Sequence, residues 1–416
     1  MKKKTLQKIS RLFASLVLVG AMSLGTVTTA NAAGGPQIYG ENDTPTAGIT
    51  VEYKMAKDVV TPAASTTFTF TKAATGQPEG ATVPELSVNP ISFTQGSNDG
   101  LDSSVTDSKV LRKQSENFLT GFIAALNNGK MTTGEYKYTV SSTTKITPNK
   151  EGDSYIASQA EYNISIFVAQ KTDKTLYIKG LGITESKNDK GDAGSNKKVD
   201  ATPGDGTSSG NFSDLKFVNE YVAKAGGTGP DVPNPSDSST YAFKVTDTEV
   251  DGTSNGFAYK MTVKKPVGVT TKENTYTYYI FDEKGAKVSE ISAQYGDEAD
   301  FALKNGYSMV IKSCYAGSTV NVTQTGQSNW VASALPTFNG VASTKAETAA
   351  MGLDLTIANK TIGQKENKVE YTNKYSDIAV TGIIVNNFPF VMMIVMAMAA
   401  FVAIVAVKSR RRMNER

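Results

Sequence analysis

The sequence predicts an all-β chain of two tandem β-sandwich domains, with a short helix in the first domain and a C-terminal transmembrane helix. Three observations support this fold class. Short stretches alternate β-branched or aromatic residues with polar ones, which is typical of half-buried strands. A segment rich in Gly and Pro divides the strand-forming region into two parts. A run of uncharged, mostly apolar residues near the C-terminus is long enough to span a bilayer.

The first 32 residues have the pattern of a secretory signal peptide. They combine a basic start, an apolar run from Leu12 to about Leu24, and the small residues Ala30 and Ala32 before Ala33. The apolar run is too short to cross about 30 Å of hydrocarbon as a helix. We therefore expect cleavage between Ala32 and Ala33 and export of the rest of the chain.

Strands are predicted where the period-two alternation is clearest, at residues 49–53, 67–70, 136–140, 162–168 and 275–280. Antiparallel β-sandwiches are the natural product of such a pattern. Residues 110–126 break it, because their large apolar side chains recur near helical spacing. This segment predicts a short helix that covers an edge or an end of one sheet.

Two low-complexity stretches set the domain boundaries. Residues 187–210 consist largely of small and polar residues, so we expect a disordered loop inside a first domain that spans 33–222. Residues 223–240 are rich in Gly, Pro and Ser and predict a linker, partly flexible and partly stiffened by proline. The second domain is then expected at 241–377.

Composition excludes several classes of function. The chain has 416 residues, one cysteine and no histidine, so catalysis and metal binding that depend on histidine are excluded. We expect no enzyme, no catalytic residues, no cofactor and no metal site. Cys314 has no partner for an internal disulfide. The formal net charge of +3 comes from the two ends of the chain, which leaves the exported region acidic and argues against nucleic acid as a partner.

Both strand-forming regions end in the same five-residue pattern: an aromatic residue, any residue, an Asn, any residue and a Tyr. In the first region the pattern is Phe217 to Tyr221, and in the second it is Tyr371 to Tyr375. The pattern indicates two related domains, each of which ends in a strand with an Asn near its close.

With this pattern, the chain resembles Gram-positive surface proteins of the streptococcal pilin isopeptide-linkage family, the backbone-pilin type, from about residue 49 to the C-terminus. The resemblance implies two immunoglobulin-like, pilin-type sandwiches. It also implies that a Lys in a Val-x-Lys setting on the first strand attacks the side-chain amide of the Asn on the last strand and releases ammonia. A Glu that follows a Val-Thr pair on a neighbouring strand assists. The amine must be neutral and the carboxyl protonated, which burial favours.

In the second domain the resemblance assigns Lys265 as the nucleophile and Asn373 as the acceptor. Lys265 lies in a Val-x-Lys setting within 260–267, and Asn373 follows Tyr371 in the repeated pattern. The position that follows Val322 and Thr323 is Gln324, not Glu. A glutamine can donate a hydrogen bond to the amide but cannot transfer a proton.

In the first domain Asn219 stands at the acceptor position, and the place of the Glu is taken by Ser142. No Lys stands at the matching point of 49–53, and Lys54 is displaced by one residue. Lys54 has the wrong parity for an inward side chain unless a β-bulge intervenes. The alternative interpretation is that such lysines are simply solvated.

Residues 378–382, Ile-Ala-Val-Thr-Gly, precede the predicted transmembrane helix at 383–407 and a basic cytoplasmic tail at 408–416. This order resembles a cell-wall sorting signal, in which a sortase cuts between Thr381 and Gly382 and transfers the Thr carboxyl to an amine. Ala379 takes the place of the usual Pro. Two interpretations remain open, covalent attachment to the wall and a simple membrane anchor.

The sequence thus predicts an exported structural protein of the cell surface, a pilin subunit or adhesin, held in the cell wall or by a single membrane pass. Its expected partners are a sortase, peptidoglycan or another pilin subunit, the membrane through its C-terminal helix, and a host or cell-surface ligand. The alternative is a membrane-anchored adhesin that is neither sorted nor polymerised. Trp330 is either a ligand-facing aromatic or a packing residue, and the acidic group at 297–300 is interpreted as a solvated turn.

Overall fold

The computed structural model describes residues 37–126, 128–204, 212–227, 229 and 231–376. In this part of the chain nearly all regular structure is β, with one short helix, α2 (Thr120–Leu126), so the all-β prediction is confirmed there. The predicted signal peptide, sorting motif, transmembrane helix and basic tail lie outside the described residues. No helix within the described ranges combines the length and the apolar character needed to cross a bilayer.

The first domain is a sandwich of a six-stranded and a four-stranded sheet. The larger sheet has the order β1 (Gln37–Ile38), β9 (Leu176–Lys187), β8 (Glu161–Gln170), β6 (Gly134–Thr147), β3 (Ala63–Lys72) and β4 (Ile91–Phe93). The smaller sheet has the order β5 (Ser108–Gln114), β2 (Thr50–Ala56), β10 (Lys216–Val222) and β7 (Ser154–Ile156).

Period-two alternation determines which side chains enter the core. In β8, Tyr162, Ile164, Ile166 and Val168 are buried, whereas the residues between them are partly or fully exposed. The five stretches that alternate most clearly in the sequence coincide with parts of β2, β3, β6, β8 and β14 (Thr275–Phe281), which confirms those strand predictions.

The predicted helix at 110–126 is only half correct. Val110 and Leu111 lie in β5, which pairs in regular antiparallel register with β2, so this half is extended. The helix is restricted to α2, which buries Phe122 and Leu126 and contacts β9. Asn117 lies just before α2, and its Oδ1 accepts a hydrogen bond from the Leu119 backbone N–H at 3.1 Å.

The prediction of a disordered loop at 187–210 is wrong for the described residues 187–204. The Asp189 carboxylate accepts hydrogen bonds from the Val218 backbone N–H at 2.8 Å and from the Ser158 hydroxyl at 2.6 Å. Lys198 forms a β-bridge with Thr184, and Ala201 is fully buried. Polar contacts to the sandwich therefore order a segment that has little apolar surface of its own.

The second domain is a sandwich of an eight-stranded and a four-stranded sheet. The larger sheet has the order β15 (Lys287–Gln294), β14, β17 (Ser308–Ile311), β12 (Phe243–Val250), β24 (Lys368–Tyr375), β20 (Trp330–Phe338) and β21 (Val341–Ala342), and β22 (Glu347–Thr348) also pairs with β20. The smaller sheet has the order β16 (Glu298–Leu303), β13 (Phe257–Lys264), β19 (Thr319–Gln324) and β23 (Leu355–Thr361).

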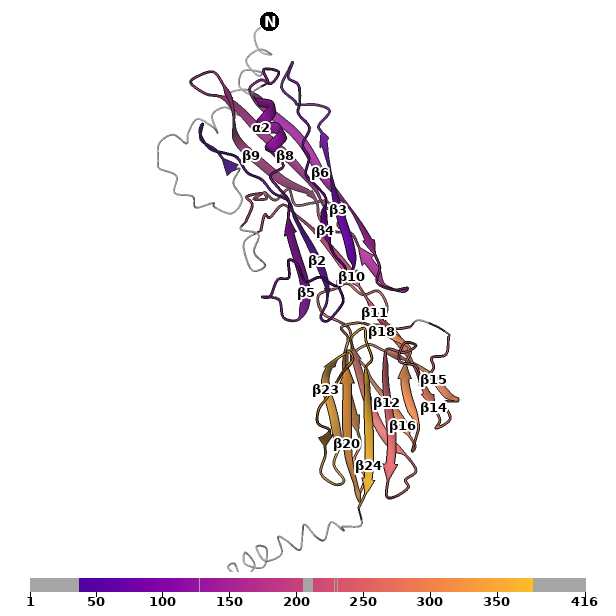
Figure 1. Cartoon of the computed structure of the whole chain (residues 1–416). Coiled ribbons are helices and arrows are strands. Elements are labelled where there is room, and N and C mark those ends of the chain that lie inside the picture. The colour runs from indigo at the N-terminus through magenta and orange to yellow at the C-terminus, as the bar shows by residue number, and fades with distance from the viewer. Residues whose placement is uncertain (1–36, 127, 205–211, 228, 230, 377–416) are drawn as a thin grey trace, which may run out of the picture.

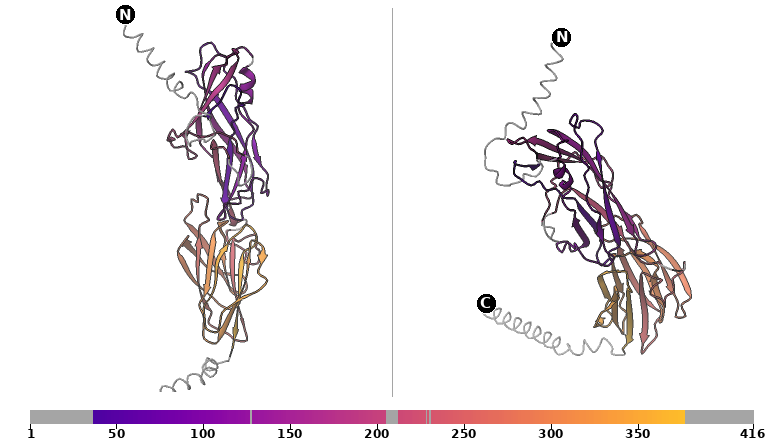
Figure 2. Two further views of the ribbon diagram at one scale, coloured as in Figure 1. Left: turned by 90° about the vertical axis from the view of Figure 1, so that its left-hand side faces the viewer. Right: turned by 45° about the horizontal axis from the view of Figure 1, so that its top comes forward.

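The two domains lie end to end and are joined by more than a linker (Figure 1 and Figure 2). Within the predicted linker 223–240, β11 (Lys224–Gly226) pairs antiparallel with β18 (Ser313–Tyr315) of the second domain. One cluster of buried apolar side chains extends from the first domain through the fully buried Ala225 into the second. The Glu220 carboxylate also accepts a hydrogen bond from the Thr270 backbone N–H at 2.7 Å. The first part of the segment is thus a structural element of the junction.

In both domains the first main strand and the last strand are parallel neighbours. β2 pairs in parallel with β10, and β12 pairs in parallel with β24. A chain that begins and ends on parallel neighbours enters a domain at one end and leaves it at the other. Figure 1 shows the result: β24 ends at the end of the second domain that lies farthest from the first.

We predict that Gly226→Ala strongly destabilises the junction. Gly226 has a φ of 60°, and a Cβ there would lie 2.1 Å from the Ala242 backbone nitrogen, so packed backbone would have to move. Gly80 is the matched control, because its φ of 68° is similar but a Cβ would contact nothing within 4 Å. We expect a loss of about 1 kcal/mol for Gly80→Ala and about 3 kcal/mol or more for Gly226→Ala in urea unfolding. Equal losses would contradict the packing argument.

Candidate functional site

The second domain buries a cluster of four polar side chains between its sheets. Asp247 comes from β12, Asn373 from β24, Tyr259 from β13 and Gln324 from β19. Each is at most 1% exposed. We call these four residues the Asp247 cluster. It connects the first strand of the domain with the last strand and with two strands of the opposite sheet.

Strand alternation and register bring Asp247 and Asn373 together. In β12 the inward positions are Phe243, Val245 and Asp247, and in β24 they include Tyr371 and Asn373. The parallel register places Asp247 opposite Tyr371 and one inward position before Asn373. The two polar side chains are therefore diagonal neighbours on the inner face of one sheet.

The Asp247 carboxylate is the common acceptor of the cluster. Its Oδ2 accepts hydrogen bonds from the Tyr259 hydroxyl and from Asn373 Nδ2, the latter at 3.1 Å. Gln324 Nε2 lies 3.5 Å from the same oxygen and donates to the Tyr259 hydroxyl at 3.0 Å. Burial raises the pKa of Asp247 to about 7, although the hydrogen bonds from Tyr259 and Asn373 lower it.

The structure does not bring Lys265 to Asn373. Lys265 follows β13 and is only partly buried; its Nζ donates to Asn274 Oδ1 at 2.7 Å and lies 6.0 Å from the centroid of the Tyr295 ring. The expected pairing fails because residues 260–267 begin in β13, which belongs to the opposite sheet, and not in the first strand of the domain.

The first strand of the domain is β12, which carries Val245-Thr246-Asp247. Asp247 thus occupies the place of the lysine in the Val-x-Lys setting. Gln324, which the resemblance places at the position of the Glu, contacts the same carboxylate as Asn373. Within the described residues, no lysine amine forms a hydrogen bond with Asn373. The cluster thus contains an acceptor amide and no nucleophile that could displace ammonia from it.

In the first domain Asn219 occupies the corresponding inward position of β10 and is fully buried. Its Oδ1 accepts a hydrogen bond from the Ser158 backbone N–H at 3.1 Å, and its Nδ2 has no partner in the described part of the chain. The register places Val51 opposite Phe217, at the position that corresponds to Asp247. Ser142 lies on β6 with its hydroxyl buried and likewise unpartnered there. In the described part of the first domain, no lysine amine forms a hydrogen bond with Asn219.

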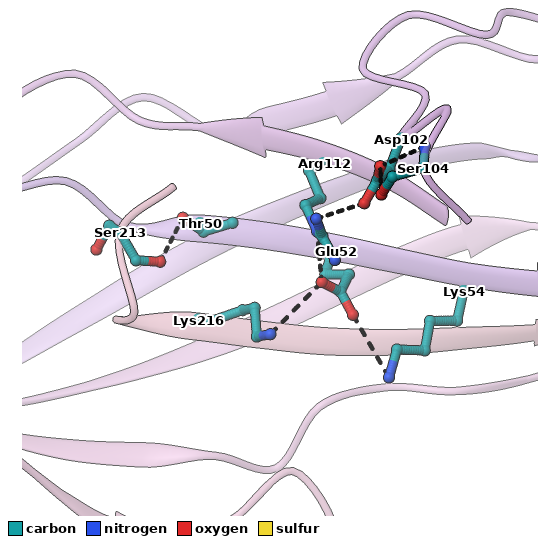
Figure 3. Close-up of polar contacts among 8 residues, drawn as sticks. All are labelled: Thr50, Glu52, Lys54, Asp102, Ser104, Arg112, Ser213 and Lys216. Carbon is teal, nitrogen blue, oxygen red and sulfur yellow. Dashed lines mark hydrogen bonds and ion pairs between the residues drawn. The ribbon is translucent and has the colours of Figure 1, made fainter. Parts of the chain in front are cut away.

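Lys54 points toward Glu52 (Figure 3). β2 pairs with both neighbours without a bulge, so Lys54 lies on the face opposite to Tyr53, which is the residue opposite Asn219 in the register. The Lys54 amine lies 3.4 Å from Glu52 Oε1 and is 38% exposed. Strand parity therefore places Lys54 on the face of β2 opposite to the one that faces the Asn219 side chain.

Glu52 is the centre of an ion-pair network on that outer face. Its carboxylate is only 2% exposed and contacts Arg112 Nε at 2.7 Å and Lys216 Nζ at 3.5 Å in addition to Lys54. Burial raises the pKa of Glu52, but the hydrogen bond from Arg112 and the nearby positive charges outweigh burial, so the pKa falls below its ordinary value. Arg112 also contacts Asp102, which Figure 3 shows on a neighbouring loop. The network holds β2, β5 and β10 together.

The structure also places two further candidates from the sequence, Trp330 and the acidic group at 297–300. Trp330 is 6% exposed and makes edge contacts with the rings of Phe257 and Tyr375, at centroid distances of 5.4 and 5.3 Å, so it is a packing residue. In the acidic group at 297–300, Glu298 forms an ion pair with Lys260. No group of three or more acidic or cysteine side chains in the described ranges is arranged to hold a metal ion.

Sequence reasoning missed Asp247 and Tyr259. The available signal was the alternation of Phe243, Val245 and Asp247, which places a carboxylate on the apolar face of a strand. The Val-x-Lys setting of Lys265, which lies just beyond β13 of the opposite sheet, drew the nucleophile assignment away from β12.

No protein-family model matches the chain, and no curated protein matches it. Among solved structures, the major pilin from Streptococcus pyogenes is similar at 14% identity and a TM-score of 0.30, with 80% of this chain and 100% of that chain covered. A pilus-presented adhesin is similar at 10% identity and a TM-score of 0.22, with 52% and 36% covered. These low values establish neither the family nor the function of this chain.

Proposed function

We propose that the chain is an exported structural protein of a Gram-positive cell surface, a pilin subunit or adhesin that a sortase attaches through Thr381. The observation that carries the proposal is the parallel pairing of first and last strands in both domains, which arranges the sandwiches end to end. An anchor that follows β24 would hold the second domain at the surface and project the first domain outward (Figure 1).

The sequence at both ends supports this arrangement. A leader with the pattern of a signal peptide precedes the first domain, and the motif 378–382, an apolar stretch and a basic tail follow the second. The junction supports it as well, because β11 and β18 pair across it and a shared apolar core runs through it. A surface stalk needs such a joint to keep the outer domain extended.

The second candidate function is a membrane-anchored adhesin that is neither sorted nor polymerised. It is favoured by Ala379, since the proline that pre-bends a sortase substrate is absent and more conformational entropy is lost on binding. We further propose that both domains are closed without a covalent bond between their first and last strands, because Asp247 and Val51 occupy the places where an amine would be needed.

We predict that the intact mass of the purified protein equals the mass calculated for its processed sequence, without loss of ammonia. Peptide mapping should recover the peptides that contain Lys265 and Asn373 separately. A deficit of one ammonia, together with a linked peptide that contains Lys265 and Asn373, would contradict the arrangement described above and restore the expected bond.

We predict that muramidase releases the protein from the wall of a Gram-positive host that carries a sortase. Thr381→Ala should move the protein to the membrane fraction, because the acyl group that is transferred belongs to Thr381. Ser376→Ala is the control and should behave as wild type, since Ser376 contacts Asn329 through its backbone N–H and its side chain forms no hydrogen bond with the described residues.

Recovery of both wild type and Thr381→Ala in the membrane fraction would favour the membrane-anchored adhesin. A ladder of oligomers that resist sodium dodecyl sulfate would identify a pilus subunit among sorted proteins. Full-length protein in the cytosol with an uncut leader would contradict surface display.

A further inference from the structure

We propose that the Asp247 cluster is a buried proton-binding site that stabilises the second domain. A proton on Asp247 completes the hydrogen bonds of the cluster, and the domain becomes less stable when that proton is lost. This inference goes beyond the proposed function and does not depend on how the protein is anchored. It rests on the hydrogen-bond inventory of four side chains that come from four strands.

The cluster has more acceptors than its donors can reach. Three buried oxygens have no partner in the described part of the chain: Asp247 Oδ1, Gln324 Oε1 and Asn373 Oδ1. All the observed donors of the cluster point instead to Asp247 Oδ2 or to the Tyr259 hydroxyl. Buried acceptors without a donor cost free energy, and such groups are rare in folded proteins.

One proton relieves this imbalance. Of the four side chains, only the Asp247 carboxyl can gain a donor near neutral pH, because the amides and the tyrosine already carry all the hydrogens they can hold. A proton on Oδ1 turns an unpartnered acceptor into an O–H donor, in a cluster where the oxygens of Gln324 and Asn373 also lack donors. All four side chains are at most 1% exposed, so competition with bulk water weakens this hydrogen bond little.

Among the described residues, Asp247 forms no ion pair with a lysine or arginine that would stabilise its ionised form. The titratable groups near it are Tyr259, Tyr371 and Glu249. Both tyrosines are buried, and burial raises their pKa far above neutrality. Glu249, further along β12, adds a negative charge that also raises the pKa of Asp247.

The first domain shows the opposite solution for a buried carboxylate. Glu52 on β2 is as deeply buried, but Arg112, Lys54 and Lys216 surround it, so its pKa is lowered. The contrast indicates that the absence of cations around Asp247, and not burial alone, makes it a proton site.

The direction of the pH dependence follows from the raised pKa. The folded domain keeps a proton up to about pH 7, whereas the unfolded chain releases it near the ordinary value of 3.8. The stabilisation is therefore complete below about pH 4 and is lost as the pH rises through about 7. Between pH 5 and pH 8 the ratio of folded to unfolded second domain should fall on the order of a hundredfold.

The test uses Trp330, the only tryptophan of the chain, which lies in β20 beside β24 and reports on the second domain alone. The full-length protein in a mild detergent is unfolded with urea at pH values from 4 to 8 and followed by Trp330 fluorescence. Wild type should lose stability steadily toward pH 8. Asp247→Asn, which cannot ionise, should remove most of this slope, and Asp300→Asn, an exposed aspartate of the same domain, should keep it.

Tyr259→Phe separates a proton site from a merely structural role. The Tyr259 hydroxyl lowers the pKa of Asp247, so its removal should shift the midpoint of the pH dependence to higher pH. A general loss of packing would lower stability at every pH without moving that midpoint.

Carboxyl carbon NMR of the folded wild type gives a second measurement that does not depend on any variant folding. The Asp247 signal should titrate near pH 7. Titration of Asp247 below pH 5, a wild type whose second domain shows no loss of stability between pH 5 and 8, or an unchanged slope in Asp247→Asn would each overturn the proposal.

Discussion

Parallel pairing between the first and last strands is the constraint on which the rest of this structure depends. It makes each sandwich a unit that the chain enters at one end and leaves at the other, so that two units can stack lengthwise. It also places the repeated asparagines, Asn219 and Asn373, beside the first strand of their own domain. Two other features depend on this pairing. The strands β11 and β18 connect the two stacked domains, and the Asp247 cluster connects the paired strands β12 and β24.

Most of the fold could be predicted from local sequence, because alternation is a property of neighbouring residues. The asparagines could also be found, since the repeated pattern marks the last strand of each domain. The partner of Asn373 could not, because it depends on which strand is first in the sheet. β12 and β13 both alternate apolar and polar residues, and only the observed topology distinguishes them. The ordered segment near Asp189 was missed for a similar reason: its contacts come from residues distant in sequence.

The two buried carboxylates show how sequence position and environment combine. Glu52 and Asp247 lie on the first strands of their domains, but parity places Glu52 on the outer face and Asp247 on the inner face. On the outer face, lysine and arginine side chains can reach a carboxylate while their charged ends remain partly exposed. On the inner face only uncharged partners are packed, so neutralisation by a proton is the available route. A shift of one residue along the first strand thus changes the face on which the carboxylate lies. Protonation in acid weakens the network around Glu52, whereas it stabilises the cluster around Asp247.

A stalk that is pulled from its ends loads the β12 and β24 pair along the strand direction. In this geometry the hydrogen bonds between the two strands all resist the sliding of one strand past the other at the same time. Seven register pairs connect the two strands. The Asp247 cluster lies on the same pair and extends the resistance to the opposite sheet through Tyr259 and Gln324. A covalent bond would fix the two strands permanently. Hydrogen bonds instead break when the domain opens and re-form when it closes, because no covalent bond has to be remade. In the proposed surface protein, the acidity of the cell exterior therefore sets how firmly the first and last strands of the second domain are held.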